Sequence, residues 1–140
     1  MNKPVTALAF DFGTRSIGVA YGQSLTGGAR ELAPLPAKDG KPNWDSVEGL
    51  IKEWQPHLLL VGLPLNMDGS ESEFGVRARK FSQRLHGRYG LPVELIDERL
   101  STRAAKEEAN ERGHRGNYAK DPVDSIAARI ILEDWLRTRG

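Results

Sequence analysis

The sequence predicts an α/β fold in which helices flank a five-stranded mixed sheet. Three observations predict it. The first 35 residues hold three short apolar runs joined by tight turns, and connections this short favour antiparallel neighbours. The hydrophobic period then changes to that of an amphipathic helix. From residue 58 onward, short aliphatic runs alternate with helical segments, as in a parallel sheet with crossover helices.

The antiparallel part begins with a predicted strand over residues 5–12, which is apolar on both faces apart from the acid Asp11. A tight turn leads into a second strand at 17–21, and a further turn leads into a third strand at 29–35, before Pro36. We expect the first of these strands to lie in the centre of the sheet.

The rest of the chain alternates helices with aliphatic runs. Apolar residues recur at helical spacing after Asn43, which can act as an N-cap, and Gln55-Pro56 ends that helix. A last helix, running to about residue 136, opens at Asp121-Pro122, because proline is favoured at the first helical position. Between them we expect a strand at 58–62, a helix at about 73–86, a strand at 93–97 and a helix at 102–112.

Length and composition exclude several classes of function. The 140 residues carry a net charge of +1, so no overall field draws the protein to a membrane or a nucleic acid. Cysteine is absent, which excludes disulfides, thiolate nucleophiles, iron–sulfur clusters and Cys-ligated zinc. The sequence shows no signal peptide, and its longest apolar stretch is too short to span a bilayer. We therefore expect a single cytoplasmic domain over residues 1–140 that does not contact membranes.

Acidic residues stand at the ends of several apolar elements. Asp11 lies between two phenylalanines, where burying an unpaired carboxylate is costly, and this favours a functional role. Asp97 and Glu98 end the last strand, and because side chains alternate, only one of them can share a face with Asp11. Asp124 stands in the first turn of the last helix and should point at the sheet. The apolar face that it starts continues through Ala128, Ile131 and Trp135.

Converging carboxylates in a chain without cysteine fit a hard divalent cation. Mg²⁺ prefers oxygen ligands and completes its shell with water and substrate phosphate, and a bound cation relieves the repulsion among the acids. Two such ions can activate a water and stabilise the leaving oxygen of a phosphodiester. Other roles stay open, because Asp121 is well explained as a helix N-cap and Asp124 as a partner of the helix dipole.

Four motifs in chain order carry a resemblance to a known family. They are DFGTRSIGVA at 11–20, VGLPLNMDG at 61–69, DERLST at 97–102 and DPVDSIAA at 121–128. Together they resemble the YqgF (RuvX) family over nearly the whole chain. The resemblance implies a ribonuclease H-like fold related to the RuvC Holliday junction resolvases. It also implies a nuclease that matures the 5′ end of 16S ribosomal RNA precursors.

Matched motif to motif, the resemblance places the family's catalytic and metal-binding acids on Asp11, Glu98 and Asp124. It thereby selects Glu98 over Asp97 by analogy. The implied cofactor is Mg²⁺ or Mn²⁺, with two ions expected. The implied partner is structured RNA, either free precursor ribosomal RNA or a ribosomal subunit, and we expect a monomer or a weak homodimer.

Polar and basic residues near these acids are the predicted substrate contacts. Loops that follow sheet strands, where α/β sheets usually bind ligands, carry Thr14, Arg15, Asn66 and Arg99. The helix at about 73–86 carries a basic stripe in a segment without acids, and its alternative role is a solvated face. The stripe consists of Arg77, Lys80, Arg84 and Arg88. A second basic patch consists of Arg112, Arg115 and Lys120. Such contacts position a nucleic-acid backbone and do not read its sequence.

Three functions compete at this point. The leading hypothesis is a metal-dependent nuclease that acts on structured RNA, with DNA junctions as an alternative substrate that needs two active sites in a dimer. The second is phosphotransfer, because DFGT at 11–14 also resembles the first phosphate loop of the actin, Hsp70 and sugar-kinase superfamily. Those proteins bind ATP between two domains, whereas we expect one. The third is a non-catalytic factor that binds ribosomal RNA or the transcription machinery.

Overall fold

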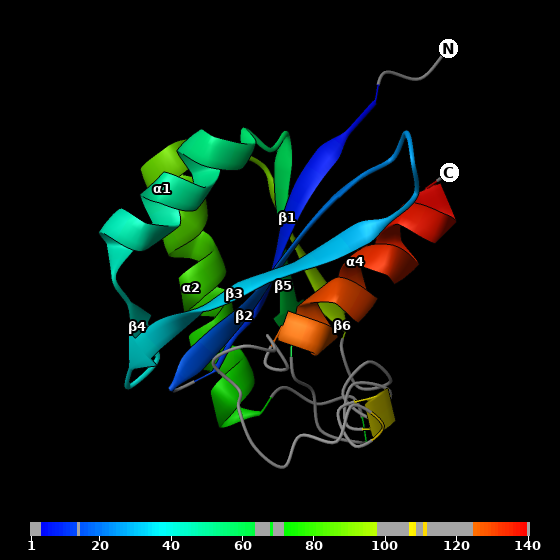
Figure 1. Ribbon diagram of the computed structural model, residues 1–140. Coiled ribbons are helices and arrows are strands. Elements are labelled where there is room, and N and C mark those ends of the chain that lie inside the picture. Colours follow the sequence, from blue (N-terminus) through cyan, green and yellow to red (C-terminus); the bar gives the residue numbers. More distant parts are fainter. Residues whose placement is uncertain are drawn as a thin grey trace.

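The computed structural model describes residues 4–13, 15–63, 68, 72–97, 107–108, 111 and 125–139. They form a six-stranded mixed sheet with helices on both faces (Figure 1). The strands are β1 (Thr6–Asp11), β2 (Ser16–Gln23), β3 (Ala29–Lys38), β4 (Lys41–Pro42), β5 (Leu58–Leu63) and β6 (Val93–Asp97). The helices described in full are α1 (Trp44–Trp54), α2 (Glu73–Tyr89) and α4 (Ile126–Arg139).

The strand order is β4-β3-β2-β1-β5-β6, which confirms the predicted topology. β1 pairs with β2, β2 with β3 and β3 with β4, all antiparallel, whereas β5 pairs in parallel with both β1 and β6. The expected central position of β1 is therefore confirmed, because it lies between the antiparallel and the parallel halves of the sheet.

The prediction of five strands was wrong by one strand. β3 continues past Pro36, where Ala37 N–H donates to the carbonyl of Arg15 (2.9 Å), and it ends only at Lys38. Asp39 and Gly40 then adopt positive φ angles of 53° and 78°, and the chain reverses into β4. Positive φ at both central residues is the requirement of a two-residue type I′ hairpin turn, for which Asp-Gly is a preferred pair.

The two faces of the sheet carry side chains of different size. Leu8 and Phe10 of β1 belong to a core that includes Phe81 and other residues of α1 and α2, and we call this side the α1/α2 face. Ala7 and Ala9 belong to a second core with α4, and we call that side the α4 face. Figure 1 shows α1 and α2 on one side of the sheet and α4 on the other.

Small residues let α4 approach the sheet closely. A Cβ added at Gly22 of β2 would lie 3.0 Å from methyl carbons of Leu132 and Leu136 in α4. A larger side chain at this position would push the helix outward, because packed cores resist added volume. The predicted apolar face of the last helix is confirmed, since Ala128, Ile131 and Trp135 are buried.

The ends of the helices follow their capping residues. As predicted, Asn43 caps the start of α1, where it accepts a hydrogen bond from Asp45 N–H (2.9 Å), and the helix ends at Gln55. Gln55 adopts the left-handed conformation. α2 starts after Ser72, which accepts from Gly75 N–H (2.9 Å), and it ends at Gly90, later than the predicted residue 86. Glycine is the usual residue at a left-handed helix end.

Parts of two predicted helices lie outside the described residues. Of the helix predicted at 102–112, residues 107, 108 and 111 are described and are helical. The predicted opening of the last helix at Asp121-Pro122 also lies outside, and α4 is described from Ile126. No helix among the described residues combines the length and the apolar character needed to cross a membrane.

Replacing Gly40 with alanine is expected to destabilise the protein by about 1–3 kcal/mol. The alanine would have to adopt the positive φ of 78° of this position, and its Cβ would lie 2.8 Å from Cζ of Phe12. The matched control is Gly49→Ala in α1, where nothing lies within 4 Å of the added Cβ. That change should stabilise by up to about 1 kcal/mol, because alanine favours helix. Urea unfolding measures both, and equal stability of the two variants would contradict the hairpin geometry.

Candidate functional site

Asp11 ends the central strand and lies on the α4 face of the sheet. Side chains alternate along a strand, so Asp11 shares its face with Ala7 and Ala9, which pack toward α4. The next residue, Phe12, belongs to the core of the opposite face. Asp11 is partly exposed, whereas the four preceding residues of β1 are buried. The structure therefore places one carboxylate at the carboxyl end of the central strand, at the boundary of the apolar interior.

Both residues that pair with Asp11 in the neighbouring strands are glycines. Asp11 is paired with Gly18 of β2 and with Gly62 of β5. Residues paired across neighbouring strands project to the same face, but neither of these partners has a side chain. The positions that flank Asp11 on the α4 face are thus free of side chains from its own sheet neighbours.

Asp97 lies on the wrong face to join Asp11. In β6, Val93 and Leu95 pack into the core of the α1/α2 face, whereas Ile96 packs against the core of the α4 face. Alternation places Asp97 on the α1/α2 face. Glu98 follows and lies outside the described residues, so its role stays a prediction.

Asp124 also lies outside the described residues, but the next residue is firmly held. Ser125 is fully buried, accepts a hydrogen bond from Val19 N–H (3.0 Å) and donates one to the carbonyl of Leu32 (2.6 Å). These two groups flank a register shift between β2 and β3. The Ser125 hydroxyl thus bridges Val19 N–H of β2 and the Leu32 carbonyl of β3, and it fixes the start of α4 beside Val19. Val19 directly follows Gly18, the partner of Asp11.

An ionic cluster holds α4 against β3 from the outside. The guanidinium of Arg129 lies 2.9 Å from Glu31 of β3 and 3.5 Å from Glu133 of α4, and it also pairs with Glu108. Burial opposes the charge on Arg129. The hydrogen bond and charge of Glu108, with the charges of Glu133 and Glu31, outweigh burial and raise the Arg129 pKa above its ordinary value. Arg129 is therefore a permanent cation that joins three acidic side chains.

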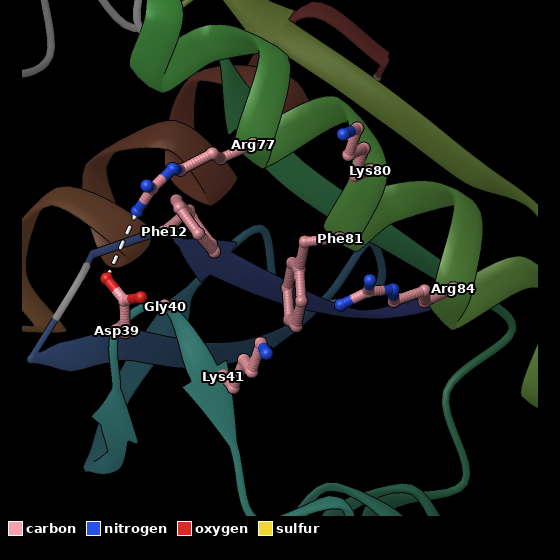
Figure 2. Close-up of a pocket in the computed structure, with 8 residues that line it drawn as sticks. All are labelled: Phe12, Asp39, Gly40, Lys41, Arg77, Lys80, Phe81 and Arg84. Atoms are coloured by element: carbon pink, nitrogen blue, oxygen red, sulfur yellow. Dashed lines mark hydrogen bonds and ion pairs between the residues drawn. The ribbon is translucent and has the colours of Figure 1, made fainter.

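The basic stripe of α2 faces a pocket of about 200 Å³ beside the end of β1. Figure 2 shows Arg77, Lys80 and Arg84 around it, together with Phe12 and Phe81. The pocket is closed on the far side by the β3–β4 turn. That turn contributes Asp39, Gly40 and Lys41.

Lys41 lines this pocket and is absent from the contacts predicted from the sequence. The signal that identifies it is the Asp39-Gly40 pair, which predicts a hairpin and so brings the next residue back toward the sheet. Arg15, another predicted contact, is exposed at the start of the strand next to β1. The predicted contacts Thr14, Asn66, Arg99 and Lys120 lie outside the described residues.

The donor set tests whether a metal ion fits. Asp11 supplies carboxylate oxygens next to two glycine positions, which suits the oxygen ligands and retained waters of Mg²⁺ or Mn²⁺. Within the described part of the chain, no three acidic or histidine side chains gather into a cluster that could hold a metal ion. The other two predicted ligands, Glu98 and Asp124, are outside that part.

Comparison with known proteins gives one family. A sequence model of the RuvX family, described as Holliday junction resolvase, matches residues 5–138. A protein of Saccharophagus degradans is 64% identical over 132 residues, with 94% of this chain and 93% of the relative covered. A protein of Chromohalobacter salexigens is 64% identical over 128 residues, with 91% and 86% covered. Both relatives carry the name "Putative pre-16S rRNA nuclease".

A solved structure confirms the fold class. The RuvC protein of T. thermophilus, solved in complex with a Holliday junction substrate, superposes with a TM-score of 0.56 at 17% identity. The match covers 96% of this chain and 95% of the RuvC chain. At this level of identity the likeness concerns the fold, and it agrees with the expected ribonuclease H-like sheet.

Replacing Ser125 with alanine is expected to cost about 1–3 kcal/mol, because it leaves the buried Val19 N–H and Leu32 carbonyl without this partner. The matched control is Ser82→Ala. Ser82 is also buried, but its hydroxyl only donates to the carbonyl of Arg79 within its own helix. That change should cost less than about 1 kcal/mol. Chemical unfolding measures both, and an equal cost would show that Ser125 does not join α4 to the sheet.

Proposed function

The chain belongs to the RuvX family, and on that premise we propose that it is a metal-dependent nuclease that hydrolyses phosphodiester bonds in structured RNA. Its proposed role is the 5′-end maturation of precursor 16S ribosomal RNA, the substrate in the names of its close relatives. The observation that carries the proposal is the place of Asp11 between Gly18 and Gly62 at the end of the central strand.

Three acids form the proposed centre. Asp11 comes from β1, Glu98 follows β6, and Asp124 precedes Ser125 at the start of α4. The described neighbours of these positions support the assignment. Ile96 packs on the α4 face, as Asp11 does by alternation, and Ser125 bonds to the strand next to β1. Asp97 is not proposed as a ligand, because it falls on the opposite face.

The proposed cofactor is Mg²⁺ or Mn²⁺, in a pair of ions held by Asp11, Glu98 and Asp124. When bound, such ions supply the charge that acidifies a water and neutralises a leaving oxygen. The chain itself contributes the carboxylates that would hold these ions, because a bare carboxylate repels a phosphate. Gly18 and Gly62, the residues paired with Asp11, place no side chain of their own beside it.

The basic side of α2 is proposed to hold the substrate backbone near this centre. Arg77, Lys80 and Arg84 gather around the pocket that Phe12 lines. Phe12 follows Asp11 at the end of β1 but faces the other side of the sheet, so the bound backbone is proposed to pass around this end of the sheet to reach the acids. Arginine and lysine contacts to phosphates fix the position of a nucleic acid without reading its sequence. The substrate is therefore expected to be selected by its shape.

A DNA junction is the second candidate substrate, because the matching family model is described as Holliday junction resolvase. Symmetric cleavage of such a junction would need two copies of the centre in a dimer. Purified protein should be incubated with precursor 16S ribosomal RNA and with a four-way DNA junction, each with Mn²⁺ or with chelator. Metal-dependent cleavage at the 5′ end of the RNA is expected. Cleavage of the junction alone would assign the second substrate, and no cleavage of either would indicate a binding factor.

Substitutions that remove the charge of single acids test whether Asp97 or Glu98 binds the metal. Asp11→Asn and Glu98→Gln should each lower the cleavage rate by more than about a hundredfold, because each removes a metal-binding carboxylate. Asp97→Asn is the matched control and should retain activity within about threefold, since Asp97 lies on the other face. The measurement is single-turnover cleavage at saturating Mn²⁺. Loss of activity in Asp97→Asn with full activity in Glu98→Gln would reverse the assignment.

A further inference from the structure

A second hollow adjoins the pocket beside Phe12 and extends it along α2. It has a volume of about 460 Å³ and is lined by Lys41, Trp44, Arg84, Gly87 and Arg88. Lys41 and Arg84 line both hollows, so the two share a wall on each side. The β3–β4 hairpin and α2 thus line two adjoining open hollows, which together we call the hairpin groove.

Cations from separate elements meet in the hairpin groove. Arg77, Lys80, Arg84 and Arg88 come from α2, and Lys41 comes from β4. Among the residues that the structure describes, the acid paired with this set is Asp39, at 3.4 Å from Arg77, and both side chains are exposed. No described carboxylate lies within salt-bridge distance of Lys41, Lys80 or Arg84. Like charges brought together in this way repel, and an anion between them removes the repulsion.

Aromatic rings form the floor of the groove. Trp44 stacks on Phe81 with centroids 5.8 Å apart, and Phe81 packs against Phe12 at 5.6 Å. The guanidinium of Arg88 lies 4.2 Å from the Trp44 ring centroid. An apolar floor lowers the local dielectric constant and strengthens the attraction of the cations for a bound anion. The ring contacts also hold Arg88 in place before a ligand binds.

The groove has the length of a short nucleic-acid segment. Arg77 and Arg88 are eleven residues apart in α2, which is about 17 Å at a rise of about 1.5 Å per residue. One strand of a duplex advances about 3.4 Å per phosphate, so this distance covers about five nucleotides. The Arg77 end lies beside Phe12, which follows Asp11 at the end of β1 but packs on the opposite face of the sheet, and the Arg88 end leads away from this strand end.

We propose that the hairpin groove binds the sugar–phosphate backbone of a nucleic-acid strand that extends away from the scissile bond, with Lys41 and Arg84 contacting phosphates from opposite walls. The identity of that strand rests on the proposed nuclease function, but the backbone chemistry does not, since RNA and DNA present the same phosphates. Asp39 limits the affinity of the groove, because it neutralises Arg77 at the end nearest the catalytic acids.

The test is a binding measurement that needs no cleavage. Wild-type protein in chelator is titrated with a fluorescent RNA duplex and with a DNA duplex of the same sequence, at several salt concentrations. Lys41→Ala and Arg84→Ala should each weaken binding about three- to tenfold and lower the log–log salt slope by about 0.9, the value for one lost phosphate contact. Arg84→Lys keeps the charge and should retain the slope. Asp39→Asn should strengthen binding, because it frees Arg77.

Two cations outside the groove serve as matched controls. Lys52 lies 3.4 Å from Glu48 on α1, and Arg137 pairs with Asp134 on α4. Lys52→Ala and Arg137→Ala should leave affinity and salt slope unchanged. Thermal unfolding of every variant separates lost contacts from lost folding.

Each outcome of this experiment decides the proposal. Reduced slopes on both duplexes, or on only one of them, support the hairpin groove and identify its nucleic acid. Slopes for Lys41→Ala and Arg84→Ala equal to those of the controls would overturn it. Intact binding without metal-dependent cleavage of any substrate would instead count against the nuclease function and leave the groove standing.

Discussion

The pairing of Asp11 with Gly18 and Gly62 is the constraint on which the rest of the site depends. A slip of one residue in either pairing would set a strand's side chains on the opposite face, so the register must be held firmly. Side-chain size holds it. Leu8 and Phe10 are large and fill the core beneath α1 and α2. Ala7 and Ala9 alternate with them on the other face, where their small side chains let α4 pack close to the sheet. Exchanging the two sets would overfill one core and empty the other.

The same constraint explains how α4 is placed. The helix lies directly on β2 because Gly22 has no side chain to hold it away, and Ser125 bonds its first turn to both β2 and β3. Arg129 adds an ionic link from the helix to Glu31 of β3. The helix that follows Asp124 is thus fixed to the strand next to Asp11 by packing, hydrogen bonds and charge. The proposed acidic centre at the carboxyl end of β1 depends on all three kinds of interaction.

Much of the fold could be predicted from local patterns, and the failures have physical causes. Short apolar runs located β1, β5 and β6, and a capping residue located the start of α1. β4 was missed because Pro36 was taken as the end of β3, while the strand accommodates it and continues to the Asp39-Gly40 turn. Ser125 and Lys41 were missed as well. Their partners are distant in sequence, and a bulge or a groove wall leaves no periodic signal. Alternation separated Asp97 from Glu98, but only the packing of the other β6 side chains showed which face Asp97 takes.

A metal centre at Asp11 is the central claim, and paramagnetic broadening of backbone amide NMR signals by Mn²⁺ tests it most directly. Substoichiometric Mn²⁺ should broaden the amides of Gly18 and Gly62 first, because these residues flank the carboxylate in the sheet. The same titration of the Asp11→Asn variant should leave both amides sharp. Broadening centred on other acids, such as Asp39 of the hairpin or Asp134 of α4, with Gly18 and Gly62 unaffected, would contradict a metal centre at this position.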